Sequence, residues 1–158
     1  MKLISTILLI CSSLVLYSQN SNISFKTVSP LSVYSDIWND IKYSKCNTAA
    51  HADYMSEDEK NTIYILNLIR TNPALFANTV LKKYPSMSGN DHLATDAYYF
   101  LSLVNTLKQM DPLGLLYPDK TCFESAQCHA ASSGMAGYAG HKRINRDCEK
   151  KKLYNGEC

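Results

Sequence analysis

The side chains best suited to chemistry in this 158-residue chain are concentrated in residues 121–158. This stretch holds four of the six cysteines, two of the four histidines and four of the six glycines. Thiols and imidazoles can form disulfides, bind metal ions or act as nucleophile and base. The adjacent pair Cys128 and His129 does not favour nucleophilic catalysis, because neighbouring residues on a helix point about 100° apart.

Several common kinds of site are absent from the sequence. It contains no Gly-x-Ser-x-Gly elbow, no phosphate-binding glycine loop, no dinucleotide fingerprint and no His-Glu-x-x-His pair. The serines near His129 (Ser125, Ser132 and Ser133) fit a helix surface better than a nucleophile. The net charge is only +2, and Asp147 and Glu149 interrupt the basic cluster of residues 142–152. We therefore expect a solvated loop there and no nucleic-acid partner.

The first residues have the form of a secretory signal peptide. Met1-Lys2 is followed by an apolar run over residues 3–16, which is too short and interrupted for a comfortable membrane span. We therefore expect residues 1–18 to be removed and the protein to be secreted into the extracellular space, without a transmembrane segment. Residues 19–53 would form an N-terminal arm, and residues 54–158 would form the single domain that this length allows.

Cysteines of a secreted protein are disulfide candidates. After signal removal they number five, which is odd: Cys46, Cys122, Cys128, Cys148 and Cys158. Cys122 and Cys128 cannot pair within one helix, because six residues rise about 9 Å. Cys148 and Cys158 flank a ten-residue excursion and could pair across it. The pairing stays open, and the alternative is that some of these cysteines are small buried hydrophobic residues.

The elements that position these residues are predicted to be helices. Ser56 and Glu59 form a capping box that begins a helix ending near Thr71, and Pro73 suits the first turn of another that ends near Leu81. Further helices are predicted over 35–42, 96–109 and 121–135. The last would begin with a second capping box, Thr121 with Glu124, and residues 111–114 (Asp-Pro-Leu-Gly) match a type I turn.

The helix over 121–135 carries small residues at helical spacing, which predicts a tightly packed, buried element. We expect a common core of Leu66, Ile69, Phe100, Val104, Phe123 and Ala130. Trp38 is expected to pack the N-terminal arm onto the domain. Asn67 and Arg70 share one helix face, and we assign them the structural role of fixing the helix end and nearby carbonyl groups.

An ordered series of short motifs resembles the first half of the CAP domain. The series is Ala126-x-x-His129-Ala130, Met135, Gly140-His141 and Gly156-Glu157. Upstream, residues 66–73 and Leu75-Phe76-Ala77 are similar to the opening helices of bacterial members. The CAP superfamily includes cysteine-rich secretory proteins, insect antigen five and plant pathogenesis-related proteins. The likeness covers roughly residues 54–158.

The resemblance implies an α+β fold, with a sheet between helices in an α-β-α sandwich. The part of the domain present here would be mostly α-helical, because most of the sheet in CAP domains follows the Gly-Glu motif. We therefore expect an incomplete sequence, truncated within the domain, and the odd number of cysteines favours the same interpretation.

The resemblance also implies a cleft that can hold a divalent metal such as zinc. His141 matches the first histidine of that cleft and Glu157 its first glutamate, whereas Cys158 stands where asparagine is usual. A second histidine and a second acid would come from later in the chain, so two ligands are too few for tight zinc binding here. His129 resembles a helix position outside the cleft and is expected to serve packing. No cofactor is required.

Members of this superfamily are mostly regarded as secreted binding or interaction modules, and some bind sterols or other lipids. The resemblance therefore implies a module for an extracellular protein, a lipid or another small apolar ligand, more often than an enzyme. One alternative is a metal-assisted hydrolase that uses the histidine and glutamate cleft. Another is a purely structural helical protein stapled by disulfides.

Overall fold

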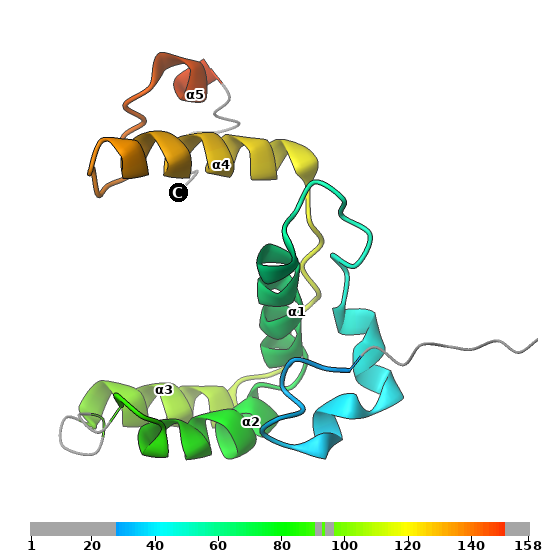
Figure 1. Cartoon of the computed structure of the whole chain (residues 1–158). Helices are drawn as coiled ribbons and strands as arrows, with labels where there is room; N and C mark the ends of the chain where they lie inside the picture. The colour runs from blue at the N-terminus through cyan, green and yellow to red at the C-terminus, as the bar shows by residue number, and fades with distance from the viewer. Residues whose placement is uncertain (1–27, 91–92, 94–96, 151–158) are drawn as a thin grey trace, which may run out of the picture.

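The computed structural model describes residues 28–90, 93 and 97–150. These residues are mostly helical, and no strand occurs among them. The predicted helical content is thus confirmed for this part of the chain. The signal peptide, Glu157 and Cys158 lie outside the described residues. In Figure 1, α2 and α3 lie side by side at one end, α1 rises from them, and α4 crosses the other end beneath α5.

The elements of the described part are all helical. In chain order they are η1 (Asp36–Asn39), η2 (Ile41–Cys46), α1 (Glu57–Thr71), α2 (Pro73–Phe76), η3 (Ala77–Leu81), η4 (Tyr84–Ser86), α3 (Tyr98–Gln109), α4 (Lys120–Met135) and α5 (Arg146–Lys150).

Helix α1 begins and ends where the sequence predicts. The Ser56 hydroxyl accepts a hydrogen bond from the Glu59 amide at 3.3 Å, and the Glu59 carboxylate accepts one from the Ser56 amide at 2.7 Å. The predicted capping box is therefore confirmed. After Thr71 the Asn72 side chain accepts from the Leu75 amide and begins α2, with Pro73 in its first turn.

The N-terminal arm packs against α1 and η3 through Trp38, whose side chain is fully buried. The indole Nε1 donates to Thr79 Oγ1 at 3.1 Å, and the ring lies 5.1 Å from that of Tyr43. The predicted packing role of Trp38 is confirmed. The predicted helix over 35–42 is replaced by two 3₁₀ helices, because the Asp40 carboxylate accepts from the Lys42 amide and begins a new turn there.

The apolar core consists of two clusters rather than one. The first joins the arm, α1 and η3 through Leu31, Trp38, Tyr43, Cys46, Tyr64, Leu68 and Val80. The second joins η3 to α3 through Ala77, Leu81 and Leu107, with Ile69, Phe76, Phe100 and Val104 partly buried against them.

The predicted common core is wrong for three of its six residues. Ile69, Phe100 and Val104 do pack together, but Leu66 is 40% exposed and Ala130 is exposed. Phe123 packs instead on Tyr54, with ring centroids 5.3 Å apart. A stripe of alanine and glycine offers little apolar area, so it gives α4 only a weak drive towards the core.

The covered face of α4 is polar and lies under its own C-terminal extension. Ser125, Ser132 and Ser133 are buried, while Ala126, Ala130 and Gly134 are exposed. The loop after α4 returns along the helix, and Arg143 donates to the Ser125 carbonyl at 2.8 Å and to its hydroxyl at 3.0 Å. The Cys128–Cys148 disulfide joins α4 to α5. We call α4, this loop and α5 the stapled hairpin.

Two local predictions near α4 are also corrected. The cap of α4 is Asp119, whose carboxylate accepts from the Cys122 amide at 2.8 Å, so the Thr121–Glu124 capping box does not begin this helix. Residues 110–119 form an extended connector along α1 in place of a turn at residues 111–114. The Leu113 amide donates to the Arg70 carbonyl at 2.8 Å, which draws the chain away from a local turn.

Candidate binding groove

A mostly apolar groove lies between the first half of α1, residues 116–119 and the first two turns of α4. It has a volume of about 360 Å³. The side of α1 contributes Ile63, with Met55 from the segment before it, and α4 contributes Cys122, Phe123 and Ala126. The connector supplies the rest of the wall through residues 116–119. We call this the α1–α4 groove.

Asn67 fixes the connector wall of the groove from inside α1. Its side chain is fully buried. The Asn67 amide nitrogen donates to the Leu116 carbonyl at 2.9 Å and to the Cys46 carbonyl at 3.0 Å, and its oxygen accepts from the Leu116 amide at 2.7 Å. Arg70, one turn further along, donates from Nε to the Gly114 carbonyl at 2.7 Å. The two residues together hold the connector against α1.

The α4 side of the groove is positioned by the cap and by an aromatic pair. Hydrogen bonding from the Cys122 backbone amide lowers the pKa of Asp119 from its ordinary value of 3.8, so this carboxylate is charged at neutral pH. Phe123 projects from the first turn of α4 onto Tyr54, and the Lys120 ammonium lies 6.0 Å from the Tyr54 ring centroid. These contacts keep Phe123 at the edge of the groove.

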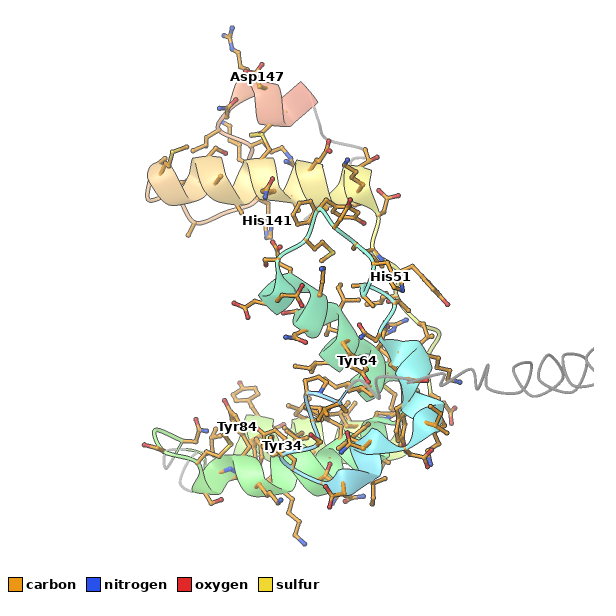
Figure 2. The ribbon with its side chains drawn as sticks, turned by 45° about the vertical axis from the view of Figure 1, so that its right-hand side comes forward. Tyr34, His51, Tyr64, Tyr84, His141 and Asp147 are labelled. Carbon is orange, nitrogen blue, oxygen red and sulfur yellow. A yellow bond between two sulfur atoms is a disulfide. The ribbon has the colours of Figure 1, made fainter. Side chains whose placement is uncertain are left out.

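The predicted cleft residues lie away from this groove or outside the described part. His141 is exposed in the loop between α4 and α5, beside α4 on the side that faces α1 (Figure 2). Glu157, its expected partner, and Cys158 lie outside the described residues. Within residues 28–90, 93 and 97–150, no three His, Cys, Asp or Glu side chains lie close enough together to hold a metal ion.

His129 is engaged within the stapled hairpin. Its Nε2 lies 3.1 Å from the Gly140 carbonyl and its Nδ1 lies 3.3 Å from Ser133 Oγ. Both ring nitrogens therefore have partners, and the imidazole helps to close the loop onto α4. The neighbouring Cys128 is in the disulfide with Cys148, so the thiol–imidazole pair does not exist here.

The cysteines differ in environment. Cys148 pairs with Cys128 and not with Cys158 as one candidate pairing had it. Cys46 is fully buried, with Sγ 3.3 Å from Thr71 Oγ1, and Cys122 is exposed at the mouth of the α1–α4 groove. Cys122 and Cys128 do not pair, as the helical spacing predicts.

The sequence does not reveal the groove in advance, because its walls come from three separated segments. Phe123 is apparent only as a member of the α4 stripe, and Met55 and Tyr117 carry no motif. One signal is present in the sequence: Tyr117 precedes Pro118, and a residue before proline tends to be extended. This favours an extended segment directly before α4.

In comparisons with known proteins, no family model, curated protein or solved structure matches the chain. Among the described residues, no helix combines the length and apolar character needed to cross a membrane.

Proposed function

We propose that this chain is a secreted binding module of the CAP type that takes a small apolar ligand in the α1–α4 groove. The supporting observation is the groove itself, a concave and mostly apolar surface formed by Met55, Ile63, Leu116, Phe123 and Ala126. Its volume of about 360 Å³ falls in the range of small-molecule sites, about 300–1,000 Å³. Ligands that fit are compact and mainly neutral, with one polar group able to reach Asp119.

The CAP-type assignment and secretion belong to the same proposal. The α-β-α sandwich is the fold that the resemblance implies for a full domain. Sequencing the N-terminus of exported protein tests the secretion step, and the expected start lies between about Gln19 and Ser24. Recovery of an intact Met1 terminus from inside the cell would contradict it.

A titration with the neutral fluorescent probe 1-N-phenylnaphthylamine tests the groove. Ala126→Phe places a large side chain in the groove without removing any packed group, because Ala126 is exposed on its wall. We expect this variant to bind the probe at least about tenfold more weakly, since excluding two or more buried CH₂ equivalents has that effect.

Ala130→Phe is the matched control, one turn further along α4, exposed and outside the groove lining. It should bind the probe like the unmodified chain. Equal probe affinity in both variants, or no binding by the unmodified chain, would refute the proposed site.

A second candidate function is that of a structural protein stapled by disulfides, which the Cys128–Cys148 bridge favours. That role requires no ligand, so the probe titration separates the two. The third alternative, a metal-assisted hydrolase, would use His141 and Glu157, and the described residues supply only His141.

A further inference from the structure

A second groove lies at the opposite end of the molecule, between η3 and α3. It has a volume of about 340 Å³ and is lined by Ala77, Asn78, Leu81, Lys82, Pro85, Phe100, Leu101, Val104 and Lys108. We call it the η3–α3 groove. No described residue lines both this groove and the α1–α4 groove.

The floor of this groove is apolar and firmly packed. Ala77 and Leu81 are buried, and Phe100 and Val104 are half-buried against them in the second core cluster. The Tyr84 ring stacks beside Phe100 at 6.5 Å between centroids, at the end of the molecule where Figure 2 labels Tyr84. Because these side chains belong to the core, the floor keeps its shape without a ligand.

Two lysines stand at the rim. Lys82 follows Asn78 by four residues and Lys108 follows Val104 by four, so each lies one turn beyond a groove residue on the same helix face. Both are exposed, and no ion pair with a described residue involves either of them. Long lysine stems can cover apolar surface while their ammonium groups stay at the water boundary.

None of the described residues that line the groove carries an acidic side chain. Two cations therefore stand beside an apolar floor, and no described residue of the lining supplies a counter-charge. Neighbouring Lys83 differs, because its ammonium donates to the Tyr34 carbonyl at 2.6 Å and joins α2 and its continuation to the arm. Lys82 and Lys108 are thus the lysines among the described residues that line the groove.

From this arrangement we infer that the η3–α3 groove binds a monomeric medium-chain carboxylate. The aliphatic tail would lie on Phe100, Val104 and Leu81, and the carboxylate would sit between the Lys82 and Lys108 ammonium groups. At about 30 Å³ per non-hydrogen group, this groove holds about ten such groups, the size of octanoate. Two cations fall short of the four to eight basic residues that an anionic membrane surface requires.

The test uses octanoate, hexanoate and the neutral isostere 1-octanol, with binding followed by amide chemical shifts of the full chain. Octanoate should shift residues of η3 and α3. It should bind up to about 15-fold more tightly than hexanoate, because each of its two additional methylenes contributes about fourfold when buried. It should also bind more tightly than 1-octanol, which lacks the charge, and added salt should reduce that difference.

The variant Lys82→Gln/Lys108→Gln keeps the apolar floor and removes the two charges. It should weaken the binding of octanoate by about fivefold, the size expected for the loss of two exposed ion pairs. Its affinity for 1-octanol should stay the same. Lys45→Gln is the control, because it removes one exposed lysine of η2 that lies outside the groove lining. It should change the affinity for neither octanoate nor 1-octanol.

Four results would overturn the inference. These are no octanoate binding at millimolar concentration, equal affinity for octanoate and 1-octanol, unchanged octanoate affinity in the double variant, or shifts confined to the α1–α4 groove. Lysine-dependent binding to phosphatidylglycerol vesicles without binding of monomeric octanoate would also overturn it. Ala126→Phe should leave octanoate binding intact, so the two grooves can fail independently.

Discussion

The side-chain amide of Asn67 holds both backbone polar groups of Leu116, a residue 49 positions away. The Asn67 oxygen accepts from the Leu116 amide at 2.7 Å, and its nitrogen donates to the Leu116 carbonyl at 2.9 Å. This paired contact resembles one rung of a sheet, made by a side chain instead of a strand. It holds the connector along α1. Because the connector leads directly into α4, the contact also determines where α4 begins relative to α1.

Asn67→Ala should destabilise the chain by about 2–4 kcal/mol, because it leaves the buried Cys46 carbonyl and the part-buried amide and carbonyl of Leu116 without their partner. Urea unfolding measures the change in the free energy of unfolding. Probe binding in the α1–α4 groove should weaken as well, because the connector forms one wall of that groove. Asn61→Ala, an exposed position on the same helix, is the control and should change stability little. Similar losses in both variants would contradict the role of Asn67.

Ala130→Leu should change the free energy of unfolding by no more than about 0.5 kcal/mol, the range of most exposed substitutions. The sequence pattern places Ala130 in the core, where the same change would overpack and cost about 1–3 kcal/mol. The structure places it on the exposed face of α4. Chemical unfolding therefore decides between the two arrangements, and a loss above 1 kcal/mol would show that α4 packs on its small-residue face.

The double variant Cys128→Ser/Cys148→Ser should loosen the stapled hairpin. Closing 20 residues of chain by a disulfide contributes about 3 kcal/mol in the chain-entropy account. Limited trypsin digestion should then cleave faster after Lys142 and Arg143. Cleavage after Lys45, in η2 beside the first core cluster, serves as the internal control. Equal acceleration at all three sites would mean that the bridge stabilises the whole chain.

Acidification should destabilise the helix starts of α1 and α4. Hydrogen bonds from the Ser56 and Cys122 backbone amides lower the pKa values of Glu59 and Asp119 from ordinary values of 4.5 and 3.8. A carboxyl group whose pKa is lower in the folded state stabilises that state above its unfolded pKa. This contribution is therefore present at neutral pH and is lost as the pH falls below about 4.5.

Glu59→Gln/Asp119→Asn keeps capping side chains but removes both charges. The urea midpoint of this variant should fall less between pH 6 and pH 3 than that of the unmodified chain. Parallel pH profiles would show that the two caps do not contribute to the acid dependence.

Local rules account well for the boundaries of α1 and the start of α2, less well for the helix over 35–42 and the cap of α4, and poorly for the tertiary arrangement. Ser56 with Glu59 and the position of Pro73 act over four residues or fewer, so the sequence predicts the start of α1 and of α2. The place of α4 depends on the bonds between Asn67 and Leu116, whose partners cannot be inferred from spacing. The small-residue stripe indicates close packing in general, but it does not identify which face is covered.

The candidate site is still harder to predict from the sequence. Cys128 and Cys148 are one of several possible pairs, and only the fold of the loop over Ser125 brings them together. The α1–α4 groove depends on three segments meeting, and the η3–α3 groove on Lys82 and Lys108 arriving at one rim from two helices. Of the predicted cleft, His141 is described and exposed, whereas its pairing with Glu157 stays a prediction.

The burial of Cys46 gives a direct way to observe how often the core opens. Its thiol is fully enclosed between η2 and α1, beside Thr71. An alkylating reagent can therefore reach Cys46 only in molecules whose first core cluster has separated. When closing is faster than alkylation, the labelling rate reports the equilibrium between closed and open molecules. Mass spectrometry of the peptide that contains Cys46 would then give the opening free energy of this region under native conditions, without denaturant.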